Sequence, residues 1–137
     1  MKTRRSLKLL LGAVALVVAT SATQAKEARA PADVQASFDK FIADFRKALK
    51  ANDAEAVTRM TGFPFHFADK PDAEFFRKTG YAKIFTPKVR GCIARAKGVY
   101  DRDDNGGHGF SVFCGETIYF FTKTPDGFRF TDIGAND

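Results

Sequence analysis

Residues 101–109, with the sequence DRDDNGGHG, place oxygen-bearing side chains at alternate positions. Asp101, Asp103 and Asn105, followed by a glycine, match the first half of a calcium-binding EF-hand loop. That loop also needs an acidic residue at its twelfth position, which here is Val112, and a helix on each side. Asp, Asn and Gly are also the residues that tight turns favour. We therefore predict a hairpin turn between two strands, with a calcium site at Asp101, Asp103 and Asn105 as the weaker alternative.

The other reactive residues form no recognisable catalytic pattern. The two histidines are His66, in an aromatic run, and His108, in the glycine-rich stretch. Ser37 and Ser111 have no acid and histidine partners at a familiar spacing. The glycine-rich stretch also lacks the Lys-Ser/Thr pair that follows a phosphate-binding loop. These observations favour a protein that is not an enzyme, and we expect no cofactor.

The first 25 residues have the layout of a secretory signal peptide. Four basic residues precede an apolar stretch from Leu9 to Ala19, which is too short for a stable membrane-spanning helix. Small residues follow, and Thr23 and Ala25 occupy the positions that a signal peptidase reads. We predict a signal peptide at 1–25, a flexible tail at 26–31 and one domain at 32–137. The mature protein would then be periplasmic or secreted and have no stable membrane span, the alternative being a permanent N-terminal anchor.

Export makes a disulfide the first expectation for Cys92 and Cys114, because an oxidising compartment pairs cysteines. Cys92 lies on the apolar face of an expected helix, and Cys114 shares a strand face with Phe110 and Val112. If the helix packs on that strand face, both thiols point into one interface. Two buried free thiols or half of a metal site are the alternatives, but no histidine lies at a metal-ligand spacing from either cysteine.

The high positive charge of the whole chain comes largely from the predicted signal peptide. The chain has 22 Lys and Arg against 16 Asp and Glu, and the first 25 residues hold four of the basic residues and no acidic ones. The remainder has 18 against 16, so nucleic-acid binding loses its main support. One basic run contains no acidic residue, and a solvated helical face is its simplest explanation. The run consists of Lys83, Lys88, Arg90, Arg95 and Lys97.

The first half of the domain predicts helices. Apolar residues recur every three or four positions between residues 32 and 51, which is typical of an amphipathic helix. Asn52 or Asp53 can cap a short second helix that runs to Met60. FPFHF at 63–67 then predicts an extended segment. Two further helices are expected, one from Asp72 to near Gly80, and one with Thr86 as N-cap, Pro87 in its first turn and Gly98 past its end.

The second half predicts strands. The stretches KGVY, GFSVFCGETIYFFTK and FRFTDI are rich in aromatic and β-branched residues with a period of two. The pair Asp126-Gly127 suits a tight hairpin turn between the last two strands. Helices followed by an antiparallel meander define an α+β domain, in which N-terminal helices pack on one face of a curved antiparallel sheet.

This order of elements resembles the cystatin-like cone, which is shared by ketosteroid isomerases and nuclear-transport-factor-type domains. The segments RMTGFPFHF and KIFTPKVRGCI are similar to those of small exported bacterial proteins of this class. The resemblance covers essentially the predicted mature chain. It implies an enzyme, a small-molecule binder or an association module, because members of the class include all three.

Isomerase chemistry of that class would need a carboxylate base in an apolar pocket that faces hydrogen-bond donors. Glu116, Tyr119, Tyr81 and Asp132 are of suitable type, although surface polar roles are the preferred interpretation. A ligand pocket at the mouth of the cone would have an aromatic lining with Glu116 as a nearby acid. Its candidate residues are Phe63, Phe65, Phe67, Glu116, Tyr119 and Phe121. The opposing explanation is that the fifteen phenylalanines fill the core.

The functional expectation is an exported, non-enzymatic binding or interaction module of the bacterial envelope, with a protein or cell-envelope component as its partner. The alternative is a small-molecule carrier or weak enzyme that uses the mouth of the cone.

Overall fold

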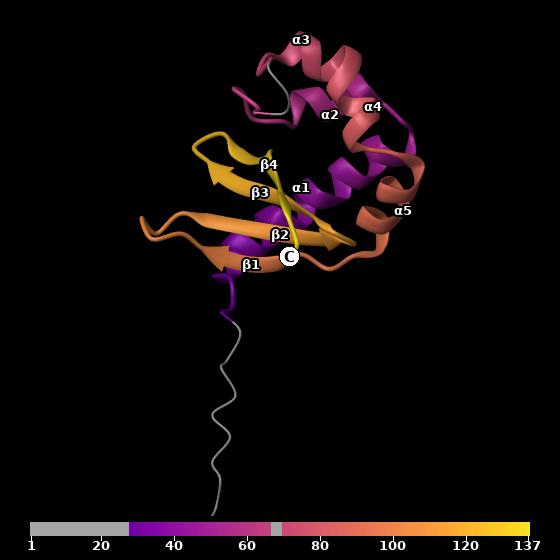
Figure 1. Cartoon of the computed structure of the whole chain (residues 1–137). Coiled ribbons are helices and arrows are strands. Elements are labelled where there is room, and N and C mark those ends of the chain that lie inside the picture. The colour runs from indigo at the N-terminus through magenta and orange to yellow at the C-terminus, as the bar shows by residue number, and fades with distance from the viewer. Residues whose placement is uncertain (1–27, 67–69) are drawn as a thin grey trace, which may run out of the picture.

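The computed structural model describes residues 28–66 and 70–137, in which helices precede a four-stranded sheet (Figure 1). The predicted signal peptide and Phe67 lie outside the described residues. The helices are α1 (Ala32–Lys50), α2 (Ala54–Arg59), α3 (Ala73–Phe75), the π-helical turn η1 (Phe76–Gly80), α4 (Tyr81–Ile84) and α5 (Pro87–Arg95). The strands are β1 (Val99–Arg102), β2 (His108–Cys114), β3 (Thr117–Thr124) and β4 (Gly127–Ala135).

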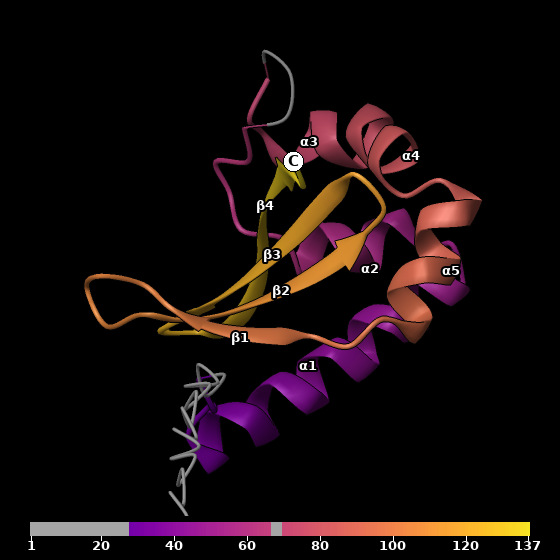
Figure 2. The ribbon, with the colours of Figure 1, turned by 60° about the horizontal axis from the view of Figure 1, so that its bottom comes forward.

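Helix α1 forms because its apolar residues fall on one side of a 3.6-residue period. The buried side chains include Phe38, Ile42, Phe45 and Leu49, each at most 5 % exposed. The side chains between them are charged and mostly exposed. The predicted amphipathic helix is therefore confirmed. Helix α1 lies along the sheet (Figure 2), and the contacts of Phe38 with Phe110 and of Phe45 with Phe121 show that its apolar stripe faces the strands.

Three side-chain caps start the shorter helices as the sequence predicts. The Asp53 carboxylate accepts a hydrogen bond from the Ala56 amide, and Asp72 does the same for the Phe75 amide. The Thr86 hydroxyl accepts from the amide of Val89 at the start of α5.

Two local predictions were wrong. The helical turns begun at Asp72 do not end near Gly80, because that glycine keeps a right-handed helical backbone and the chain continues to Ile84. The described part of the FPFHF segment forms no strand. Instead Thr61, just before it, makes a single parallel bridge to Phe130, after which the chain bends.

The strands pair antiparallel in the order β1-β2-β3-β4. Two of the connections are two-residue turns with a positive-φ glycine in or directly after them. Gly115 lies in the turn between β2 and β3, and Gly127 follows the turn between β3 and β4 as the first residue of β4. The register shifts between Phe120 and Phe121, where β4 has one extra residue, Thr131. A bulge of this kind increases the local twist and bends the strand, which contributes to the curvature of the sheet.

Phenylalanine fills the space between α1 and the sheet. Nine of the fifteen phenylalanines are at most 2 % exposed. The ring of Phe38 stacks on that of Phe110 with centroids 3.8 Å apart, and Phe45 meets Phe121 edge-on at 5.2 Å. Gly98 allows this packing, because a Cβ there would lie 2.7 Å from the Phe38 ring. Phenylalanine thus serves mainly as core, which buries large apolar areas in a chain without tryptophan.

The molecule is an α+β domain with helices on one face of a curved antiparallel sheet (Figures 1 and 2). The buried strand residues Phe110, Val112, Tyr119 and Phe121 all point to the face that α1 covers. Among the residues that the structure describes, no helix is both long enough and apolar enough to cross a membrane.

Candidate functional site

The aromatic residues expected to line a pocket lie mostly in the core. Phe65, Tyr119 and Phe121 are at most 2 % exposed and all pack around Phe130, with ring centroids 5.0, 6.3 and 5.6 Å from it. Phe63 is 37 % exposed and lies outside this cluster. The three buried rings are in contact with other rings and so form packed core.

The acidic and phenolic residues considered for isomerase chemistry are not brought together. Glu116 is exposed in the turn between β2 and β3, and the Asp132 carboxylate accepts from the neighbouring amide of Ile133. Tyr81 is buried elsewhere, where its hydroxyl donates to the side-chain oxygen of Asn52. Glu116 therefore shares no pocket with the buried Tyr119.

The loop proposed as a calcium site connects β1 to β2, so strands rather than helices flank it. One carboxylate oxygen of Asp103 accepts hydrogen bonds from the amides of Asn105 and Gly107, at 2.9 and 2.7 Å. Asp101 accepts from the amide that follows it. Within residues 28–66 and 70–137, no group of three His, Cys, Asp or Glu side chains could hold a metal ion. The side chains of this loop therefore act as those of a hairpin turn do.

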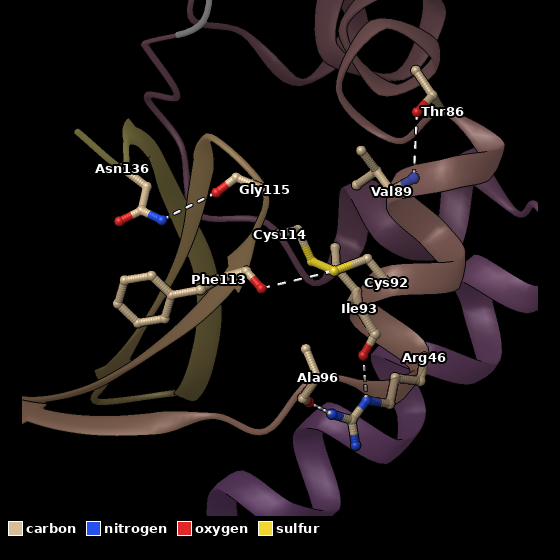
Figure 3. The surroundings of a disulfide bond; sticks show 10 residues. All are labelled: Arg46, Thr86, Val89, Cys92, Ile93, Ala96, Phe113, Cys114, Gly115 and Asn136. Carbon is tan, nitrogen blue, oxygen red and sulfur yellow. Dashed lines mark hydrogen bonds between the residues drawn. A yellow bond between two sulfur atoms is a disulfide. The ribbon is translucent and has the colours of Figure 1, made fainter.

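The disulfide between Cys92 and Cys114 is present and joins α5 to the end of β2 (Figure 3). The two Cα atoms are 5.9 Å apart, within the usual range for a bridge. The predicted link between the helical layer and the sheet is confirmed. On its other side α5 lies beside α1, and residues of both helices line a cavity.

This cavity, which we call the α1–α5 pocket, has a volume of about 410 Å³ and opens to solvent on one side. It falls within the roughly 300–1,000 Å³ range of ligand pockets. Most of its inner surface is carbon. A second cavity, beside the β1–β2 loop, holds only about 120 Å³. The α1–α5 pocket is lined by Arg46, Lys47, Leu49, Lys50, Arg90, Gly91 and Ala94.

The last turns of α1 place three cations at the pocket. Arg46 and Lys50 are four residues apart and Lys47 and Lys50 three apart, so all three side chains lie close on the helix surface. Arg90 comes from α5, on the other wall. Four of the seven lining residues are therefore cationic, and none is acidic.

Both arginines are held in place by neutral partners. Arg46 donates to the backbone oxygens of Ile93 and Ala96 at the end of α5, at 2.9 and 2.6 Å (Figure 3). Arg90 donates to the backbone oxygen of Phe85 and to the side-chain oxygen of Asn52, both at 3.0 Å. These bonds orient the guanidinium groups without neutralising them.

Within residues 28–66 and 70–137, none of the four cations forms an ion pair with a carboxylate. The ion pairs formed within the described parts of the chain involve Arg59, Arg77 and Lys78, none of which lines the pocket. The α1–α5 pocket therefore combines an apolar interior with uncompensated positive charge, an arrangement that suits an anion.

Only part of this site could be anticipated from the sequence. Arg90 belongs to the basic run that was expected to be a solvated face, and the other four members of that run are indeed exposed. The cations of α1 fall on the polar side of an amphipathic pattern, where charge is ordinary. Finding the pocket would have required knowing that α5 packs against that side of α1.

Comparisons of the chain with family models, with curated proteins and with solved structures find no match.

Proposed function

We propose that this chain is an exported, non-enzymatic binding module that holds a negatively charged partner of the bacterial envelope in the α1–α5 pocket. The observation that carries the proposal is the set of four cations around one apolar cavity, none of them paired to a carboxylate of the part of the chain that the structure describes. Export is supported by the N-terminal sequence pattern and by the disulfide, since such bonds persist in oxidising compartments.

A binding role is favoured over catalysis because the residue types needed for catalysis are dispersed. The carboxyl of Glu116 is exposed in a turn, whereas Tyr119 is buried in the core. The resemblance to the cystatin-like cone is compatible with this role, because that class includes small-molecule binders and association modules.

The proposal can be tested by capturing ligands from a periplasmic extract at physiological salt. The wild-type protein is compared with Lys47→Gln/Lys50→Gln, which removes two exposed pocket cations without touching the hydrogen bonds of Arg46. Lys83→Gln/Lys88→Gln is the matched control, since it removes the same charge from exposed positions outside the pocket.

We expect one or more captured molecules to be retained by the wild type and the control, released by moderate salt, and lost from the pocket variant. Mass spectrometry identifies what is released. Equal capture by all three proteins, or no specific capture, contradicts the proposal.

A further inference from the structure

The lining of the α1–α5 pocket has two chemically different parts. Leu49, Gly91 and Ala94 present carbon, as do the stems of Lys47 and Lys50, whereas the charged groups come only from the Lys and Arg side-chain ends. A ligand that fits both parts must itself have an apolar body and an anionic end.

The arginines retain donors for such an anionic end. A guanidinium carries five N–H donors. The hydrogen bonds of Arg46 involve its Nε and one Nη atom, and those of Arg90 involve a single Nη atom. The remaining N–H groups can donate to carboxylate or phosphate oxygens, the acceptors that arginine prefers.

The glycine at position 91 is better explained by the pocket than by a requirement of folding. It lies inside α5, where glycine costs roughly 0.5–1 kcal/mol relative to alanine. Its φ is not positive, and the nearest group to an added Cβ would be the flexible end of Arg95 at 3.6 Å. Neither backbone strain nor crowding therefore calls for glycine here, while any larger residue would add volume at a position that lines the pocket.

The helix dipole explains only part of the site. Basic residues in the last turn of α1, Lys47 and Lys50, interact favourably with the helix C-terminus. That effect explains neither the cavity nor the cation on the opposite wall, Arg90, which is near the start of α5.

We infer that the α1–α5 pocket binds an amphiphilic anion, a molecule with one carboxylate or phosphate head on an aliphatic chain. This inference rests on the proposed function and names the chemistry of its ligand. The chain lies on Leu49, Gly91 and Ala94, and the head meets the cationic side-chain ends at the rim of the pocket. A small hydrated anion leaves the apolar interior wet, and a neutral lipid leaves the cations without a counter-charge. A polyanion such as nucleic acid does not match an apolar cavity of this size.

The test is calorimetric titration of the folded, disulfide-bonded protein with alkyl carboxylates of increasing length, from acetate through hexanoate and octanoate to decanoate, below their micelle concentrations. Affinity should rise by up to about fourfold for each methylene that becomes buried, until the pocket is full. Decanol, which has the chain without the charge, should bind at least about tenfold more weakly than decanoate. Decyl phosphate is titrated in parallel, because tighter binding of the phosphate indicates a lipid headgroup and tighter binding of the carboxylate a free fatty acid.

Two variants locate the binding. Gly91→Leu adds volume at a residue that lines the pocket and should weaken decanoate binding at least about tenfold, because the added side chain competes with the ligand for space. Circular dichroism should show it folded, because leucine favours helix more than glycine does. Lys47→Gln/Lys50→Gln should weaken decanoate binding and reduce its salt dependence, whereas Lys83→Gln/Lys88→Gln should leave both unchanged.

Three results overturn the inference: no binding of decanoate or decyl phosphate, equal binding of decanol and decanoate, or unchanged binding by Gly91→Leu. If an acidic protein segment is instead captured from the extract through Lys47 and Lys50 while the alkyl anions fail to bind, the ligand class is wrong and the proposed binding function stands.

Discussion

Replacing Cys92 by serine removes the disulfide that cross-links the helical layer to the sheet. The bridge to Cys114 joins α5 to the end of β2 and closes a loop with a sequence separation of 22 residues. In the reduced or substituted protein, only non-covalent contacts hold this helix against the strand. On the α5 side these contacts come mainly from Ile93, which is fully buried.

The magnitude follows from the loop length. The chain-entropy relation, applied to 22 residues, assigns the bridge about 3 kcal/mol at 25 °C. A single domain has only about 5–15 kcal/mol of stability in total, so this loss is a large fraction of it. We expect Cys92→Ser to lower the free energy of unfolding by about 2–5 kcal/mol.

Urea unfolding followed by circular dichroism measures this change, since the chain has no tryptophan to report by fluorescence. Cys92→Ser, Cys114→Ser and the double variant should lose nearly the same stability, because each removes the same single bridge. The dependence of the unfolding free energy on urea should also become steeper, because the unbridged denatured chain exposes more surface.

Two results would refute this reasoning. If the double variant loses about twice as much as each single variant, the cysteines contribute by separate packing and the bridge does not dominate. A loss below about 1 kcal/mol with an unchanged urea dependence would show that loop closure is not what the bridge contributes. Intact mass of the non-reduced protein provides the first check, since two alkylatable thiols would mean that the bridge is absent.

Two further measurements address the tyrosines and the β1–β2 loop. Burial raises the pKa of Tyr81 and of Tyr119 above the usual value of about 10, and for Tyr81 the favourable charge of Arg90 offsets only part of that rise. The unfolded chain therefore ionises first, so this stabilisation is complete below about pH 10 and is lost as the pH rises through the folded-state values. Tyr119→Phe should show a weaker fall in urea-measured stability above about pH 10 than the wild type, and an identical fall would contradict the assignment. For the loop, thermal midpoints with calcium and with a chelator should coincide, because Asp103 already bonds two amides of its own turn; a midpoint raised by calcium would revive the metal site.

The local structure of this protein could be predicted from its sequence. The spacing of Phe38, Ile42 and Phe45 indicated α1, and Asp53 and Thr86 marked the starts of α2 and α5. The change to a period of two after Gly98 predicted the strands, since alternate strand residues face opposite sides of a sheet. The disulfide was predictable because Cys92 and Cys114 fall on the apolar faces of neighbouring elements.

Which aromatic residues are buried and which are exposed was decided by the tertiary structure. Phe63 and Phe65 are two positions apart, and both were predicted to line the same ligand pocket. In the structure Phe63 is 37 % exposed and Phe65 only 2 %. The difference arises because the chain bends after the bridge from Thr61 to Phe130, which carries Phe65 into the core. Local alternation contains no information about that long-range contact.

The α1–α5 pocket was likewise decided by packing. Lys47 and Arg90 are far apart in the sequence, and each belongs to a pattern that indicates a solvated helix face. Only the position of α5, held by its disulfide and by the bonds from Arg46 to its last carbonyls, brings the two cations to opposite walls of one cavity. Hydrophobic periodicity reports which face of a helix is buried, but which element lies beside the polar face depends on contacts between residues distant in sequence.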